Sequence, residues 1–126
     1  MLQCMGLSCG SQPLRWTLIA SVVDIPKAGA VKFTYRQEGL SREGFLFLFE
    51  GEVQAFENSC RHIPIPLDYG DCQFFNSERS QIICQNHGAR FDPLTGLCVQ
   101  GPCEGAFLNK LPVCLEEGKV YLRVLV

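Results

Sequence analysis

The chain has 126 residues, a length that suits one domain with a single hydrophobic core. Hydrophobic residues make up 47% and charged residues 19%, as in ordinary soluble globular proteins, and the formal net charge of −2 offers no basic stripe for nucleic acid. No apolar run is long enough to cross a bilayer, and the N-terminus lacks the features of a signal peptide, so we expect a cytoplasmic protein with no membrane partner. Residues 1–15 are expected to form a flexible extension to a domain that occupies residues 16–126.

Short strands separated by turns are predicted along the first third of that domain. Trp16–Val23 is rich in β-branched and aromatic residues, and Asp24-Ile25-Pro26 ends it. Val31–Tyr35 alternates in polarity, as a half-buried strand does. The polar segment Gln37–Gly44 follows it, and no regular helix is predicted in this region.

A continuous apolar run, Gly44–Phe49, comes next. Its length suits a strand, and the lack of polar positions predicts that both faces of the strand are buried. Glu50-Gly51-Glu52 is expected to form a tight turn, after which Val53–Phe56 returns as the partner strand.

A second hairpin is predicted at the C-terminus, where Leu111–Leu115 and Lys119–Val126 flank Glu116-Glu117-Gly118. Both hairpins carry paired acids beside a turn glycine, and we interpret these acids as solvated hairpin tips rather than catalytic carboxylates. The sequence of short strands and turns predicts an all-β fold, a small antiparallel sandwich or barrel.

The chain has only two histidines, and each follows a cysteine closely, in Cys60-Arg61-His62 and in Cys84-Gln85-Asn86-His87. Thiolate and imidazole ligands indicate zinc or iron rather than magnesium or calcium. Classical zinc fingers pair two cysteines in one segment and two histidines in another, whereas each segment here offers one of each. Two mixed loops suit a two-iron centre, because each loop must then reach both irons.

The residues around these four positions resemble the Rieske [2Fe–2S] family. Cys84–His87 continues into Gly88, a turn at Asp92–Gly96 and then Gly101-Pro102, which is the order found in the second half of the Rieske signature. Asn58-Ser59 precedes the first motif, as in that family. The resemblance covers residues 16–126 and implies a cluster-binding subdomain of two loops within a Rieske-like fold.

The resemblance also implies one [2Fe–2S] cluster per chain. Cys60 and Cys84 would bind its inner iron, and His62 and His87 would bind the outer iron near the surface. Gly88 would let the backbone approach the cluster, and a loop at Gly101-Pro102 would cover one side of it.

Three positions depart from the Rieske pattern. Ala89 and Phe91 stand where high-potential Rieske proteins carry serine and tyrosine hydroxyls, and Pro64 stands where members of the family usually carry glycine. Hydroxyl donors to the cluster sulfurs would stabilise the reduced state, so their absence predicts a midpoint potential at the low end of the Rieske range, on the order of −150 mV.

The function that the resemblance implies is one-electron transfer. Four protein ligands fill both irons, and no further histidine exists for the mononuclear iron that a ring-hydroxylating oxygenase needs. We therefore expect a soluble Rieske-type ferredoxin that carries electrons from a flavin-dependent reductase to a terminal oxygenase or another oxidoreductase. It would not be an enzyme itself, although it can act as a component of a multi-protein oxidoreductase.

Two alternatives stay open: an accessory Rieske-like subunit of a larger reductase complex, and a zinc-binding interaction module. Ile63–Pro66 is either an apolar docking rim around His62 or a stiff loop packed inward. Six further cysteines, with no assigned role, are expected to be reduced apolar side chains: Cys4, Cys9, Cys72, Cys98, Cys103 and Cys114.

Overall fold

The computed structural model describes residues 14–26, 29–37, 39–60, 65–68, 70–76, 78–85 and 88–125. Its elements are β1 (Leu14–Ser21), η1 (Val22–Asp24, a 3₁₀ helix), β2 (Val31–Gln37), β3 (Leu40–Phe49), β4 (Glu52–Glu57), β5 (Ile82–Ile83), β6 (Arg90–Phe91), β7 (Cys98–Gln100), β8 (Val113–Glu116) and β9 (Lys119–Leu125). The strands form three antiparallel sheets, in the orders β1-β9-β8, β2-β3-β4 and β5-β6-β7. The predicted all-β fold is confirmed.

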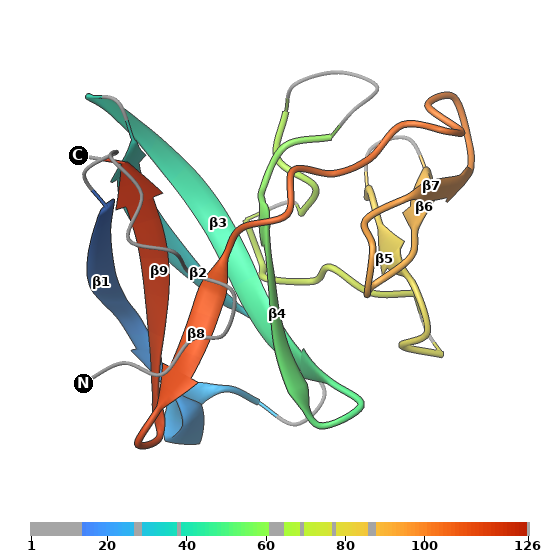
Figure 1. Ribbon diagram of the computed structural model, residues 1–126. Coiled ribbons are helices and arrows are strands. Elements are labelled where there is room, and N and C mark those ends of the chain that lie inside the picture. The colour runs from blue at the N-terminus through green and yellow to red at the C-terminus, as the bar shows by residue number, and fades with distance from the viewer. Residues whose placement is uncertain are drawn as a thin grey trace.

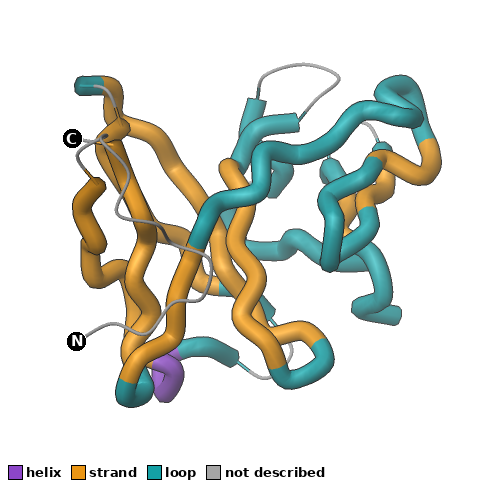
Figure 2. Tube along the Cα trace, in the orientation of Figure 1, coloured by secondary structure: helices purple, strands orange, loops and turns teal. Residues whose placement is uncertain are grey.

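Two of these sheets lie against each other, and the small third sheet lies beside them (Figure 1). Strand β4 contacts β8 and β1 contacts β2, which joins the first two sheets into a sandwich. Long loops lead from β4 to the third sheet and back from β7 to β8 (Figure 2). None of the helices in the described part of the chain is long and apolar enough to cross a membrane.

Strand β3 is buried on both faces, as its apolar run predicted. Phe45, Leu46 and Phe47 are fully buried. Successive side chains of a strand point to opposite faces, so the run serves two cores. Phe45 and Phe47 pack in the core that reaches the third sheet, whereas Leu46 packs in the core between the first two sheets.

Both predicted hairpins are present and close through two-residue turns. Glu50 and Gly51 have φ values of +52° and +81°, and Glu117 and Gly118 have values of +50° and +78°. Positive φ at both central residues gives the type I′ turn, whose twist matches that of the flanking strands. The acids at Glu50, Glu52 and Glu117 are exposed, as expected of hairpin tips.

Several boundaries differ from the prediction. The first strand begins at Leu14, which pairs with Leu125, so the last two residues of the predicted extension belong to β1, and β8 begins at Val113 and not at Leu111. The first strand ends at Ser21, because the chain turns into η1 and the Val22 N–H donates to the carbonyl of Gly118 at 2.8 Å. The polar segment after Tyr35 continues in strand pairing, since β2 runs to Gln37 and β3 begins at Leu40. The side chains from Leu40 to Glu43 are exposed, so no hydrophobic pattern marked this part of the strand.

The cysteines outside the ligand motifs are of two kinds. Cys72, Cys98 and Cys103 are free thiols, as expected. Cys114 is disulfide-bonded, so the expectation of a reduced thiol is wrong there. That expectation rested on the redox compartment, which says nothing about whether local geometry brings two sulfurs together. Cys4 and Cys9 lie outside the described residues, as do residues 1–13 of the predicted extension, which stays a prediction.

Candidate metal centre

The two cysteines predicted to be ligands lie at the starts of two neighbouring loops. Cys60 follows β4 and Cys84 follows β5, and their exposed fractions are only 2% and 0%. Both belong to the same buried core cluster. His62 and His87 lie outside the described residues, so their positions stay predictions.

We call residues 60–67 the first loop and residues 84–89 the second loop. The first loop begins with a hydrogen bond from the Cys60 N–H to the carbonyl of Ile65, at 2.8 Å. The second loop closes through the Cys84 N–H, which donates to the carbonyl of Ala89 at 2.8 Å. A further bond of 2.8 Å, from the Gln85 N–H to the carbonyl of Leu67, joins the two loops. The described ends of the two loops therefore lie side by side, as a shared cluster would require.

Gly88 adopts a φ of +74°, which side chains with a Cβ rarely adopt. Among the described residues, no atom lies within 4 Å of where a Cβ on Gly88 would stand. The positive φ of the second loop therefore explains why glycine occupies position 88, whether or not a cluster is bound beside it.

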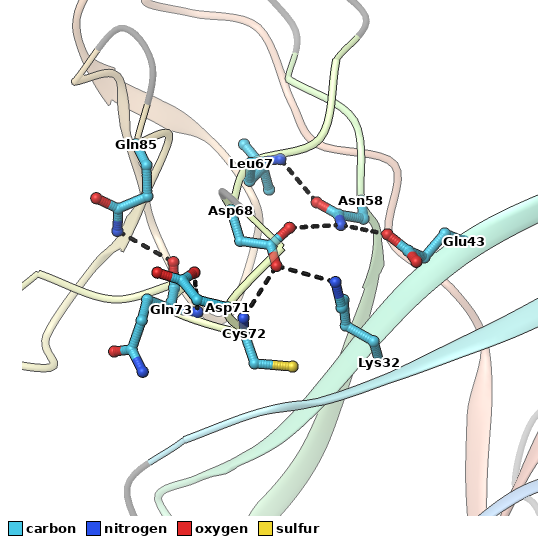
Figure 3. Close-up of polar contacts among 9 residues, drawn as sticks. All are labelled: Lys32, Glu43, Asn58, Leu67, Asp68, Asp71, Cys72, Gln73 and Gln85. Carbon is cyan, nitrogen blue, oxygen red and sulfur yellow. Dashed lines mark hydrogen bonds and ion pairs between the residues drawn. The ribbon is translucent and has the colours of Figure 1, made fainter.

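A buried polar network fixes the end of the first loop (Figure 3). Asn58 donates from Nδ2 to Glu43 Oε1 at 2.7 Å and to Asp68 Oδ1 at 3.1 Å. The other oxygen of Asp68 accepts hydrogen bonds from Lys32 Nζ at 3.1 Å and from the Cys72 N–H at 3.0 Å. Lys32 comes from β2 and Glu43 from β3, so the network ties the loop to the sandwich.

Asn58 also accepts a hydrogen bond at its own Oδ1, from the Leu67 N–H at 2.8 Å. The amide of Asn58, which precedes the first loop, therefore binds both the last residue of that loop, Leu67, and the residue that follows it, Asp68. Because Asn58 and Asp68 are buried and hydrogen-bonded, the network sets a defined loop geometry instead of leaving unsatisfied polar groups in the core.

The pKa of Asp68 is lowered by this network. Burial by itself raises the pKa of the carboxyl group, but the hydrogen bonds from Asn58, Lys32 and the Cys72 N–H together outweigh that effect. A carboxyl group whose folded pKa is lowered adds stability above its unfolded pKa, and this stability is lost as the pH falls through the folded pKa.

We therefore expect the free energy of unfolding to decrease as the pH falls below about 4, the ordinary carboxyl range. Asp68→Asn should remove most of this pH dependence and cost about 1–3 kcal/mol at pH 7, because the donors of Lys32 and Cys72 lose a charged acceptor. Urea unfolding at several pH values, with the exposed Asp71→Asn as the control, measures both effects. An equal pH slope in the two variants would contradict this role of Asp68.

Aromatic stacking holds the segment between the two loops against β3. The rings of Phe45 and Phe74 stack with centroids 4.1 Å apart and planes 5° apart. The rings of Phe47 and Phe75 meet in a T-shaped pair, with centroids 5.0 Å apart. Stacked and edge-on pairs add to the stability that burial provides. The loops and the sandwich therefore share one packed core.

The loop that follows β7 packs against the second loop. Gly101 has a φ of +114°, and a Cβ there would lie 2.8 Å from the Cα of Ala89. Only glycine allows this approach. The resemblance implied a covering loop at Gly101-Pro102, and this contact places it against the backbone that follows the predicted ligand His87.

The polar network and the contacts of Phe74 and Phe75 with β3 were not predicted from the sequence. Asp68 and Asn58 look like ordinary loop residues, and no pattern in the sequence reveals that they are buried. Of the Ile63–Pro66 run, the structure describes two residues. Ile65 is half-buried against the core, which favours inward packing for that side chain, whereas Pro66 is exposed.

Comparison with known proteins gives a match to the family model of the Rieske [2Fe-2S] domain over residues 15–116. No curated protein matches the chain. The Sphingomonas yanoikuyae B1 ferredoxin is 25% identical, with a TM-score of 0.65, over 86% of this chain and 97% of that one.

Two proteins from Nocardioides aromaticivorans IC177 have similar folds. The ferredoxin of its carbazole 1,9a-dioxygenase is 22% identical, with a TM-score of 0.66, over 85% of this chain and 95% of that one. The terminal oxygenase is 20% identical, with a TM-score of 0.69, over 89% of this chain but only 30% of its own.

Proposed function

Because the chain belongs to the Rieske [2Fe–2S] domain family and so holds one [2Fe–2S] cluster, we propose that Cys60 and Cys84 bind one iron and His62 and His87 bind the other. The donor set fits the group, since thiolates and imidazoles are ligands that iron accepts. The burial of both thiols in one core cluster, beneath two joined loops, supports the assignment of the cysteines.

We further propose that the chain is an electron carrier that receives electrons from a flavin-dependent reductase and delivers them to a terminal oxygenase or another oxidoreductase. When bound, the cluster takes up and releases one electron. The observation that carries the proposal is the burial of Cys60 and Cys84. An electron can pass through a thin layer of protein to a cluster held by buried thiols, whereas a substrate would have to contact the iron itself. Ferredoxin–oxygenase complexes are known for carbazole 1,9a-dioxygenase, which supports an oxygenase as acceptor.

The residues of the chain would orient and shield the bound group. The Asn58–Asp68 network holds the first loop in place, and the Gly101 loop packs on the second loop. Ala89 and Phe91 are fully buried and apolar, so they exclude water beside the second loop. The cytoplasmic location expected from the sequence stays a prediction.

Anaerobic titration of the iron-loaded chain with dithionite tests the carrier function. We expect uptake of one electron per chain, followed by quantitative return of that electron to cytochrome c in a stopped-flow experiment. Uptake of no electron, or of two electrons in a single step, would contradict the proposal.

The side chains beside the second loop provide a prediction about the midpoint potential. Ala89→Ser would add a hydroxyl where high-potential Rieske proteins carry one, so we expect the potential to rise. The matched control is Ala55→Ser, which makes the same change in the other buried core. Redox titration followed by visible absorbance measures both variants. A wild-type potential well above zero, or no rise in Ala89→Ser, would show that the missing hydroxyl does not set the potential.

A further inference from the structure

Two thiols outside the proposed ligand set lie in direct contact. Cys98 begins β7, and Cys103 follows the Gly101-Pro102 turn. Their Sγ atoms are 3.1 Å apart, and both cysteines are free. A disulfide bond is about 2.05 Å long, so the two sulfurs need to move only about 1 Å closer to form one.

The backbone holds these thiols opposite each other. The Cys98 N–H donates to the carbonyl of Ala106 at 2.7 Å, and the Gly105 N–H donates to the carbonyl of Cys98 at 3.0 Å. The Ala106 N–H in turn donates to the carbonyl of Cys103 at 2.9 Å. The loop between the two cysteines is therefore closed before any covalent bond forms, which removes most of the entropy cost of bringing the sulfurs together.

The two cysteines differ in access. Cys98 is 1% exposed, whereas Cys103 is only partly buried. A reagent in solution therefore meets Cys103 first, and Cys98 lies directly behind it. This is the arrangement of an attacking thiol with a resolving thiol next to it.

We propose that Cys98 and Cys103 form a redox-modification site, at which a small disulfide of the glutathione type converts the dithiol into an intramolecular disulfide. Cys103 attacks one sulfur of the oxidised reagent, loses its proton and releases one reagent thiol. Cys98 then attacks the Cys103 sulfur of the mixed disulfide, loses its own proton and releases the second thiol. The chain loses two electrons and two protons, and the reagent gains both.

This bond would restrain the loop that packs on the second loop. Gly101 lies between the two cysteines, and its close approach to Ala89 connects the site to the candidate metal centre. Burial, the adjacent Cys98 thiol and the Cys60 thiol raise the pKa of Cys103. The inference does not depend on which residues bind the cluster.

The test uses the full iron-loaded chain, incubated in mildly alkaline buffer with either reduced or oxidised glutathione. After acid quenching and alkylation, trypsin releases Phe91–Lys110, which contains Cys98 and Cys103 and no other cysteine. We expect the amount of peptide alkylated at both cysteines to be lower by about tenfold or more after incubation with oxidised glutathione than after incubation with reduced glutathione. In its place, a peptide without alkyl groups should appear, with a mass two hydrogens below that of the same peptide in its dithiol form.

Cys103→Ser is expected to abolish this product, and Cys72→Ser, which changes another free cysteine, is expected to leave it unchanged. Cys98→Ala provides a second variant in case the serine disturbs folding, and the visible spectrum shows whether each variant keeps its cluster. Two outcomes would overturn the proposal. One is a peptide that is alkylated at both cysteines after incubation with either form of glutathione, and the other is a glutathione adduct on Cys103 that does not convert into a disulfide with Cys98. Either outcome is distinct from failure to bind iron.

Discussion

Replacement of Cys84 by alanine is expected to abolish binding of iron and acid-labile sulfide and to bleach the visible spectrum. Cys84 is fully buried, and its backbone closes the second loop through the carbonyl of Ala89. Alanine keeps the backbone bond but removes the thiolate, and no solvent ligand can easily replace it at a buried position. Iron and sulfide analysis per chain, together with the absorption spectrum, measures the loss.

The matched control is Cys72→Ala, which removes a free thiol that packs against the same core but is not a proposed ligand. We expect this variant to keep its full iron and sulfide content. His62→Ala and His87→Ala should lose the spectrum as Cys84→Ala does. If Cys84→Ala binds as much iron and sulfide as the wild type, the ligand assignment is wrong.

Phe45→Ala is expected to cost about 3–5 kcal/mol of the free energy of unfolding, the range for truncating a fully buried phenylalanine. Phe45 has no exposed surface, and its ring stacks on Phe74 at 4.1 Å and approaches Phe56 at 6.1 Å. The variant leaves a cavity where the sandwich meets the segment between the two loops. Urea unfolding measures the cost, and cluster retention at intermediate urea shows whether the loops loosen first.

Phe107→Ala makes the same truncation at a ring that is 53% exposed, so it should change the free energy of unfolding by far less than Phe45→Ala does. A loss below about 1 kcal/mol in Phe45→Ala, or equal losses in the two variants, would show that the aromatic anchor does not hold the loops to the sandwich.

The elements that the sequence predicted best are those with strong local signals. The apolar run at Gly44–Phe49 has no polar position, and a strand buried on both faces is the arrangement that such a run favours. Each hairpin was predicted from a glycine that stands next to acidic residues between two strand-like segments. The glycine is the signal, because a tight hairpin turn needs residues with positive φ. Cys60 and Cys84 were predicted to be ligands because each is paired with one of only two histidines, and this assignment stays a prediction.

Other features leave no local signal. Strands β5 and β6 have two residues each, which is too short for a hydrophobic period to emerge. The contact between Cys98 and Cys103 depends on how the loop after β7 folds back on itself. The burial of Asn58 and Asp68 depends on β2 and β3, which supply Lys32 and Glu43 from distant parts of the chain. Such tertiary contacts cannot be inferred from residue spacing alone.

The central claim is that sulfur ligands hold one iron of the cluster and nitrogen ligands hold the other. Electron paramagnetic resonance of the dithionite-reduced protein tests this claim most directly, because mixed ligation lowers the average g value below that of an all-cysteine [2Fe–2S] cluster. We expect that lower average g value, with hyperfine coupling to two imidazole nitrogens. An average g value equal to that of an all-cysteine cluster, or a colourless protein that holds a single zinc ion, would contradict the claim.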